Sequence, residues 1–262
     1  ERVGTAFALA PGTECTVEAG RPDTITREKL LAIRAGGGNR ISVNPQTMSD
    51  PVLAAIGRSH RAADIRRAYA LAREVGGLAI NMDLIAGLPG DSDDGARETA
   101  RRLADLNPDT MRIYPTLVLK DTVLEEWWRE GVYQPPGLEE TVRLCAGLKA
   151  FFENEGIRVI RLGLHAQESM QQSMLAGPWH PAFGELCDGE LYFQKACAML
   201  KGQEAGAYTL FVNPSCVSRM AGQHRHNLMR LSRMGYQCRV KAEEGIPAGE
   251  IRLEEKGKKK CC

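Results

Sequence analysis

The 262-residue sequence lacks any apolar run that approaches the roughly 18 residues of a membrane-spanning helix. It shows no signal peptide, and its formal net charge is only +1. A charge this close to zero gives no general indication of a nucleic-acid partner, although it is compatible with a local basic patch. Hydrophobic residues make up 43% of the chain and charged residues 26%, which is typical of a soluble globular protein. We therefore expect a cytoplasmic protein without a membrane partner.

The spacing of the cysteines argues against a metal site. The eight cysteines lie at positions 15, 145, 187, 197, 216, 238, 261 and 262 and form neither a C-x-x-C pair nor a C-x-x-x-C-x-x-C array. The sequence therefore predicts neither a zinc site nor an iron–sulfur cluster loop, and no metal ligand is assigned. Reduced thiols of a cytoplasmic protein are the simplest interpretation. The chain begins at Glu1 rather than at a methionine, from which we expect a fragment of a longer protein.

Residues 78–90, with the sequence LAINMDLIAGLPG, predict a buried strand that runs into a glycine–proline turn. Asp83 lies within this apolar run. Because a buried carboxylate without a partner is costly, we expect Asp83 to meet a ligand or a polar neighbour such as Arg40 or Ser42. The turn follows the carboxyl end of the strand, which is where α/β folds bind ligands.

Strands and helices alternate through the first two thirds of the chain. Further strands are predicted at residues 14–20, 40–44, 111–119 and 157–164, and helices at 24–35, 62–75, 92–106 and 138–155. This alternation predicts an α/β fold with a parallel sheet and right-handed crossovers. The strand ends carry Glu18, Asn44, Gln46 and Asp83, which we expect at one rim of the sheet around one ligand.

The last third is less regular. Residues 163–179 look irregular, and beyond them we expect a helix at 180–200, strands at 207–212 and 237–241 with helices between them, and a disordered basic tail. We therefore expect a first domain over residues 1–165 and a small α/β domain over residues 166–262.

The segments TVEAGRPDTIT, RISVNPQTM, IGRSH and INMDLIAGLPG follow one another between residues 14 and 90. Together they resemble the radical S-adenosylmethionine (SAM) enzymes of the oxygen-independent coproporphyrinogen III oxidase/dehydrogenase type. From residue 91 to residue 240 the likeness changes. The segments MRIYPTLVLKDTVLEEWWREGVY, AGPWHPAF and VNPSCVSRMAGQHRHNL resemble short bacterial radical SAM proteins related to the elongator catalytic subunit.

This resemblance implies a partial (β/α)6 barrel without its first strands, a 4Fe–4S cluster, SAM, and a 5′-deoxyadenosyl radical that removes hydrogen from the substrate. It also implies a set of cofactor-binding residues: Glu18, Gln46, Arg58 and Asp83 for the polar groups of SAM, and the backbone of Leu84, Ala86 and Gly87 for its adenine. Carboxylates suit the hydroxyl and ammonium groups of SAM, and an arginine suits its carboxylate. The alternative for Glu18 is an ordinary pair with Arg21 or Arg40.

The elongator-like half implies Tyr114 and Lys120 as candidate catalytic residues on the substrate side. His224, Arg225 and His226 follow a glycine turn at the start of a predicted helix. Such a turn with basic neighbours suits an RNA phosphate, and a solvated basic helix face is the alternative.

The function implied first is radical SAM chemistry on a tRNA base, with an electron donor such as flavodoxin or ferredoxin. One alternative is the oxidation of coproporphyrinogen III in haem biosynthesis. A porphyrinogen with four propionates needs several arginines, and Arg112, Arg158 and Arg161 are an ordinary set for that purpose. The other alternative is a non-enzymatic RNA-binding remnant.

The missing cysteine triplet gives a first prediction. Three thiolates on one short loop hold the cluster in these enzymes, so we expect this chain alone to build no 4Fe–4S cluster and to show no turnover. Reconstitution with iron and sulfide, followed by absorption and EPR spectroscopy, tests the expectation. A 4Fe–4S signal from the chain alone would contradict it.

Overall fold

The computed structural model describes residues 10, 12–165 and 168–255. Among these residues, no helix is both long enough and apolar enough to cross a membrane. The chain divides into two compact units, residues 1–181 and residues 182–262.

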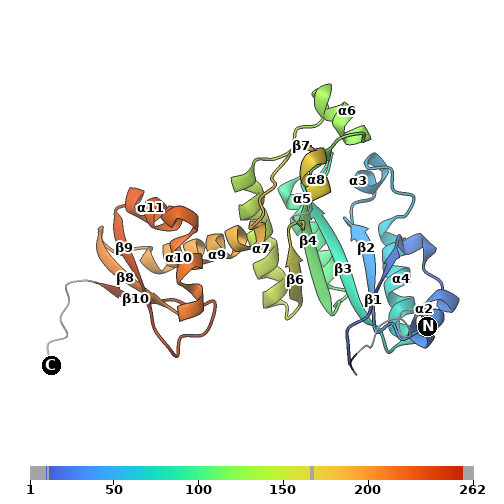
Figure 1. The fold of residues 1–262 in the computed structure, drawn as a ribbon, viewed down its shortest axis with the longest axis horizontal. Coiled ribbons are helices and arrows are strands. Elements are labelled where there is room, and N and C mark those ends of the chain that lie inside the picture. Colours follow the sequence, from blue (N-terminus) through green and yellow to red (C-terminus); the bar gives the residue numbers. More distant parts are fainter. Residues whose placement is uncertain (1–9, 11, 166–167, 256–262) are drawn as a thin grey trace. The chain divides into compact units, whose positions relative to one another are not determined.

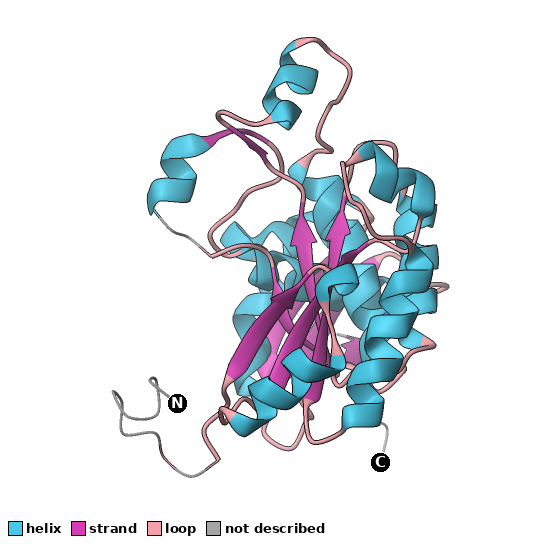
Figure 2. Cartoon of the chain, turned by 90° about the vertical axis from the view of Figure 1, so that its right-hand side faces the viewer, coloured by secondary structure: helices cyan, strands magenta, loops and turns pink. Residues whose placement is uncertain are grey.

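The first unit is built on a five-stranded sheet with strand order β1-β2-β3-β4-β6 (Figure 1). Its strands are β1 (Thr16–Gly20), β2 (Arg40–Gln46), β3 (Ala79–Ala86), β4 (Thr110–Pro115) and β6 (Arg158–Leu162). Every neighbouring pair is parallel, so that the arrowheads point the same way in Figure 2. The predicted α/β class with a parallel sheet is confirmed.

Four helices cover one face of this sheet. They are α2 (Arg27–Ala35), α4 (Ala62–Val75), α5 (Asp93–Ala104) and α7 (Leu138–Asn154), and they pack on one another and on β2, β3, β4 and β6. The covered face is apolar, and its fully buried side chains include Ile41, Val43, Ile80, Met82 and Leu84. Burial of this face removes apolar surface from water, which is the main force that holds the layers together.

Two of the helices begin with a side-chain cap, Thr26 before α2 and Ser92 before α5. The Thr26 hydroxyl accepts a hydrogen bond from the N–H of Lys29 at 3.3 Å, and the Ser92 hydroxyl accepts one from the N–H of Gly95 at 3.1 Å. Each cap satisfies a donor that the first turn of the helix leaves free.

Short elements lie beyond the carboxyl ends of the strands (Figure 2). They are α3 (Asp50–Ala55), α6 (Val123–Arg129), α8 (Glu168–Ser173) and an antiparallel pair of β5 (Val118–Leu119) with β7 (Met174–Ala176). The predictions of one strand over residues 111–119 and of an irregular stretch over 163–179 are therefore wrong. Pro115 ends β4 because it offers no N–H to continue the ladder. Since β7 pairs with β5, the first unit extends to residue 181 rather than to the expected residue 165.

The second unit combines a three-stranded sheet, order β10-β8-β9, with helices on one face. Its elements are α9 (Phe183–Leu200), β8 (Gly206–Val212), α10 (Val217–Ala221), α11 (His226–Arg233), β9 (Tyr236–Ala242) and β10 (Arg252–Glu255). β8 is parallel to β9 and antiparallel to β10. The sequence reasoning placed β10 in a charged tail and missed that Leu253 packs on the core between charged neighbours. The disordered tail predicted at the end of the chain lies outside the described residues from residue 256 onward.

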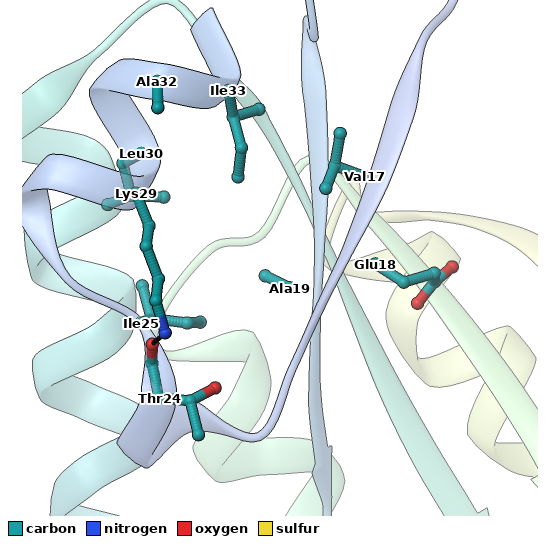
Figure 3. A pocket seen from close by; sticks show the side chains of 9 residues that line it. All are labelled: Val17, Glu18, Ala19, Thr24, Ile25, Lys29, Leu30, Ala32 and Ile33. Atoms are coloured by element: carbon teal, nitrogen blue, oxygen red, sulfur yellow. Dashed lines mark hydrogen bonds between the residues drawn. The ribbon is translucent and has the colours of Figure 1, made fainter.

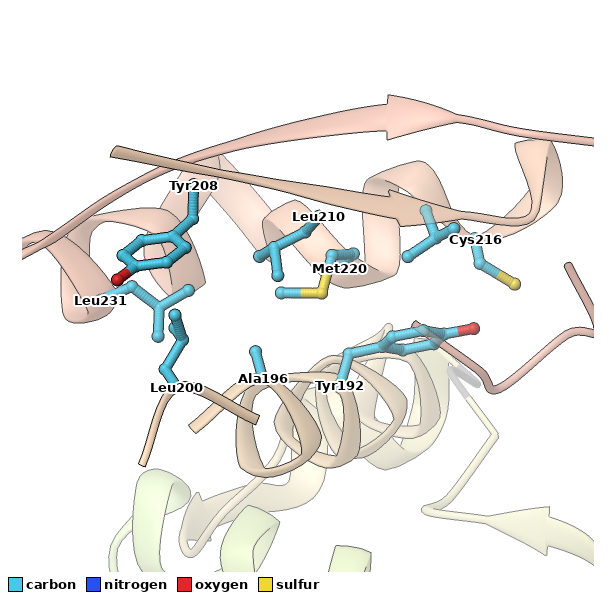
Figure 4. Close-up of a cluster of buried hydrophobic side chains, with 9 residues drawn as sticks. Tyr192, Ala196, Leu200, Tyr208, Leu210, Cys216, Met220 and Leu231 are labelled. Atoms are coloured by element: carbon cyan, nitrogen blue, oxygen red, sulfur yellow. The ribbon is translucent and has the colours of Figure 1, made fainter. Parts of the chain in front are cut away.

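The core of the second unit lies between α9 and β8. Figure 4 shows Tyr192, Ala196 and Leu200 of α9 on one side and Tyr208 and Leu210 of β8 on the other. All five side chains are buried, and three of them are fully so: Ala196, Leu200 and Leu210.

We expect Leu210→Ala to destabilise the second unit by about 2–5 kcal/mol, because it removes a fully buried side chain and leaves a cavity. Hydrogen–deuterium exchange of the β8 amides measures this loss within the unit itself. Met229→Ala is the matched control, since Met229 is 46% exposed in the same unit. Equal acceleration of exchange in both variants would contradict this account of the core.

Candidate functional site

The face of the sheet opposite the helices carries polar side chains in alternate positions. They are Glu18 on β1, Ser42 and Asn44 on β2, Asn81 and Asp83 on β3, and Thr110, Arg112 and Tyr114 on β4. The register aligns them across the strands, with Glu18 beside Ser42, Ser42 beside Asn81, and Asp83 beside Arg112. A sheet face with this composition is not a hydrophobic core and is suited to a polar ligand.

Arg112 on β4 holds two carboxylates of this face. Its Nε and Nη2 donate to the two oxygens of Asp83 at 2.6 and 2.9 Å. Its Nη1 and Nη2 donate to the two oxygens of Glu18 at 2.9 and 3.1 Å. Nη2 also donates to the Ser42 hydroxyl. One planar guanidinium therefore fixes two carboxylates along two of its edges, a geometry that only arginine provides.

A second set of hydrogen bonds holds Asp83 through its neighbour Asn81. The Asn81 side-chain amide donates to Asp83 Oδ1 at 2.8 Å and to Ser42 Oγ at 2.9 Å. The Thr110 hydroxyl in turn donates to Asn81 Oδ1 at 3.0 Å. Each buried member of this network has a partner, so the network is rigid rather than a source of strain.

Burial and pairing set the charges of the site. Burial raises the pKa of the Asp83 carboxyl above its ordinary value, and the hydrogen bonds and charge of Arg112 partly offset this. Burial disfavours the charge of Arg112, but hydrogen bonds to Glu18 and Asp83 outweigh it and raise the pKa of the guanidinium. The Asp83 side chain is 7% exposed and that of Glu18 54% exposed. Solvent therefore reaches the carboxylate pair at Glu18, whereas Asp83 is shielded from it.

Of the four residues expected at one rim, the structure joins Glu18 and Asp83 through Arg112, and Asn44 lies on the same face, where its Oδ1 accepts a hydrogen bond from Ser42 at 3.3 Å. Neither carboxylate has the partner that the sequence suggested as its alternative to a ligand. Arg112 pairs with both, rather than Arg21 or Arg40 with Glu18, or Arg40 or Ser42 with Asp83. Ser42 is joined to Asp83 only indirectly, through Arg112 and Asn81. Arg112, expected only as one of an ordinary set of arginines, is the residue that the sequence did not single out for this site. The available signal was the alternation of Thr110, Arg112 and Tyr114 with Met111 and Ile113 along β4.

Gln46 is the last residue of β2, and Arg58 lies after α3. The register between β2 and β3 shifts between Val43 and Gln46, and Gln46 has a φ of 68° and is 7% exposed. Such a bulge re-aims the side chain at the end of a strand. Arg58 is half-buried in the loop after α3, and its guanidinium makes no hydrogen bond or ion pair with a described residue. No contact joins either side chain to Asp83.

At the end of β3, Ile85 alternates with Leu84 and Ala86 and places its half-buried side chain on the polar face. The side chains of Leu84 and Ala86 lie on the helix-covered face and are fully buried. The Ala86 carbonyl accepts hydrogen bonds from the N–H and the hydroxyl of Thr116, both at 2.9 Å, and the Gly87 carbonyl accepts one from the Tyr133 hydroxyl at 2.6 Å. Gly87 has a φ of 79°, and a Cβ there would lie 3.0 Å from Pro136. Leu84 and Ala86 could thus meet a ligand only through backbone atoms, whereas Ile85 also offers its side chain.

The two candidate catalytic residues differ in their placement. Tyr114 lies on the polar face with its ring 5.9 Å from the Arg112 guanidinium carbon, and burial together with the charge of Asp83 raises its pKa. Lys120 lies in the turn before α6, where its side chain is exposed and its backbone N–H donates to Ser173 at 2.8 Å. The structure does not bring Lys120 to Tyr114.

A hollow of about 360 Å³ between β1 and α2 is separate from the polar face. Its lining is mainly apolar, and Figure 3 shows Glu18 pointing away from Ala19 and α2. This hollow therefore does not hold the carboxylate pair.

The predicted RNA-binding residues lie together in the second unit. His224 and Arg225 both have left-handed backbone, with φ of 49° and 62°, and His226 begins α11. All three side chains are exposed. Asn227 fixes the loop from inside, because its side-chain amide donates to the carbonyls of Gly189, Arg219 and Met220.

Residues 12–165 and 168–255 contain no group of three or more histidine, cysteine or carboxylate side chains arranged to hold a metal ion. The described residues therefore do not fit a 4Fe–4S cluster, which needs several thiolates close together.

Comparison with known proteins identifies two domains. The Radical SAM superfamily profile matches residues 5–103, and the Radical SAM C-terminal domain profile matches residues 108–192.

Curated relatives fall into two groups. The oxygen-independent coproporphyrinogen-III oxidase-like protein HemZ of Bacillus subtilis is 31% identical over 216 residues, which are 77% of this chain and 41% of that protein. The heme chaperone HemW of the same organism is 29% identical over 159 residues, 61% of this chain and 42% of that protein. The tRNA uridine(34) acetyltransferase of Dehalococcoides mccartyi is 32% identical over 133 residues, 50% of this chain and 29% of that protein. The chain thus spans less than half the length of these relatives.

Solved structures share the fold. Elp3 of Methanocaldococcus infernus with an N-terminal deletion aligns with a TM-score of 0.60 and 22% identity, over 70% of this chain and 46% of that chain. The coproporphyrinogen III oxidase HemN of Escherichia coli aligns with a TM-score of 0.50 and 24% identity, over 59% of this chain and 35% of that chain. Both families named by the sequence resemblance therefore recur among the relatives. With both domain profiles matched in order along a parallel α/β sheet, the chain belongs to the radical SAM superfamily.

Proposed function

We propose that the polar face of the first unit binds SAM and that the chain contributes the SAM-binding and substrate-side parts of a radical SAM enzyme. The single observation that carries this proposal is the carboxylate pair Glu18 and Asp83, held together on one guanidinium. SAM combines an ammonium, a sulfonium and two ribose hydroxyls, all of which favour carboxylate oxygens. The hydrogen-bond acceptors of the polar face fit these groups.

The chemistry that SAM supplies in this superfamily is a 5′-deoxyadenosyl radical for hydrogen-atom abstraction. In our proposal the residues of this chain bind and orient the cofactor. Asp83 and Glu18 accept hydrogen bonds from its hydroxyl and ammonium groups, and Gln46 at the end of β2 and Arg58 in the loop after α3 hold its polar ends. The backbone of Leu84, Ala86 and Gly87 lies against the adenine. Because the described residues do not fit the iron–sulfur cluster, no step is assigned to it.

Tyr114 is the better placed of the two candidate catalytic residues, since it shares the polar face with Arg112. Its phenol would donate a hydrogen bond to the substrate, and its raised pKa keeps it protonated near neutral pH. Lys120 would act only from the exposed turn before α6.

For the substrate we propose an RNA, as in the elongator-like reading of the sequence. The acetyltransferase relative and the Elp3 structure support this choice, because they resemble the chain at the level of sequence and fold respectively. The loop of His224, Arg225 and His226 supports it by its exposure and basic character. Residues 205–242 contain six lysines and arginines and no acidic residue, so an anion would meet no repulsive charge from this segment.

A second candidate is a role in haem biosynthesis, on coproporphyrinogen or haem itself. The relative HemZ favours it, because its match covers 77% of this chain, against 50% for the acetyltransferase. In either case an electron donor such as flavodoxin or ferredoxin would supply the reducing electron, and a non-enzymatic RNA-binding role stands as the third candidate.

We expect Asp83→Asn to weaken SAM binding by about tenfold or more, because a charged hydrogen-bond acceptor contributes roughly 1.5–3 kcal/mol. Equilibrium dialysis with labelled SAM measures the affinity. Glu126→Gln is the matched control, since Glu126 is an exposed carboxylate on α6. If wild-type protein binds no SAM, or if both variants bind it equally well, the proposed site is wrong.

For RNA, we expect Arg225→Ala to weaken tRNA binding and to reduce the slope of log affinity against log salt concentration by about 0.7–0.9, the loss of one phosphate contact. Filter binding at several salt concentrations measures both quantities. Arg239→Ala is the control, because Arg239 is exposed on β9 and alternates with Cys238 and Val240, which pack on the core. Equal losses in both variants would show nonspecific attraction, and tight binding of a porphyrinogen without tRNA would favour the haem-related role.

A further inference from the structure

The arrangement around Arg112 does more than neutralise one buried acid. A structural ion pair needs one carboxylate, whereas this guanidinium uses its Nε–Nη2 edge for Asp83 and its Nη1–Nη2 edge for Glu18. Glu18 lies on β1, Asp83 on β3 and Arg112 on β4, and no two of these residues are close in sequence. The strand order places β2 between β1 and β3, and its Ser42 completes the contacts of Nη2.

Two carboxylates that share one guanidinium lie close to each other. Without the positive charge between them, like charges at such a distance oppose simultaneous ionisation, and one of the pair takes up a proton. Asp83 is the one to do so, because it is buried while Glu18 is half exposed. A protonated Asp83 would lose an acceptor and its attraction for a cation.

We propose that Arg112 is a positioning residue that holds Glu18 and Asp83 together as two ionised carboxylates, so that both are ready to accept hydrogen bonds from the cationic and hydroxyl groups of SAM. The part of this inference that concerns SAM rests on the proposed function, and the part that concerns the carboxylates does not. Arg112 itself touches no reacting atom in this role.

The charged and titratable groups that face Asp83 are few. Glu18 comes from β1, Arg112 and Tyr114 come from β4, and β2 contributes the neutral Ser42 and Asn44. Arg161 on β6 pairs in register with Arg112 and acts electrostatically on Tyr114, but it makes no hydrogen bond to either carboxylate. Arg161 is therefore the natural comparison for Arg112.

The test follows the Asp83 carboxyl directly by carbon-13 NMR of protein labelled at aspartate, with Asp83→Asn used to assign its resonance. We expect Arg112→Gln to move the titration midpoint of Asp83 upward by about one to three pH units, the usual effect of an opposite charge within hydrogen-bonding distance. Arg161→Gln should leave the midpoint within a few tenths of a unit, by the same reasoning about distance. An unchanged midpoint in Arg112→Gln, or an equal shift in both variants, would overturn the inference.

The consequence for the ligand is measured separately with labelled SAM. In Arg112→Gln, the affinity for SAM should fall by about tenfold for each pH unit below the new titration midpoint of Asp83, whereas the affinity of the wild type should remain nearly constant over the same range.

Arg112→Lys is the second variant, for use if the glutamine variant does not fold. Lysine keeps the positive charge but cannot bind both carboxylates along two edges, so it should give an intermediate midpoint for Asp83. If the NMR midpoint shifts but no variant and no wild type binds SAM, the proposed function fails while the role of Arg112 stands. If SAM binds and its pH dependence is the same in all variants, the role of Arg112 fails.

Discussion

The contact on which the polar face depends is the double ion pair of Arg112. Arg112 is separated by 94 positions in the sequence from Glu18 and by 29 positions from Asp83. The contact spans four neighbouring strands, from β1 to β4. Two carboxylates on adjacent parts of a sheet would otherwise repel each other, and the buried one would be costly to ionise. The guanidinium removes both problems, so a site with two acidic side chains can exist on a sheet face that is partly shielded from water.

The rest of the first unit holds this contact in place. The helix-covered face is fully apolar and fixes the register of the strands, because a slip by one residue would turn its hydrophobic side chains outward. That same register brings Asp83 beside Arg112 and Ser42 beside Asn81. At the carboxyl end of β3, hydrogen bonds from Thr116 and Tyr133 anchor the glycine turn. The packing that fixes the strand register on the helix-covered face therefore also decides which polar side chains meet on the opposite face.

Much of the fold was predictable from local patterns. The alternation of strands and helices predicted the parallel sheet that the structure confirms. The short elements were not predictable in the same way. β5, β7 and β10 have two to four residues each, too few for a periodic signal, and they exist because a partner strand pairs with them.

The sequence alone determined the superfamily, the strand that carries Asp83, and the presence of acidic and amide residues at neighbouring strand ends. Only the tertiary structure decided which of them meet. Asp83 and Glu18 share Arg112, whose alternation with Met111 and Ile113 indicates the polar face of β4 but not the two carboxylates that it meets there. The physical reason is that alternation along a strand tells which face a side chain takes, while its partner depends on strand order and register, and both are set by packing between segments far apart in the chain.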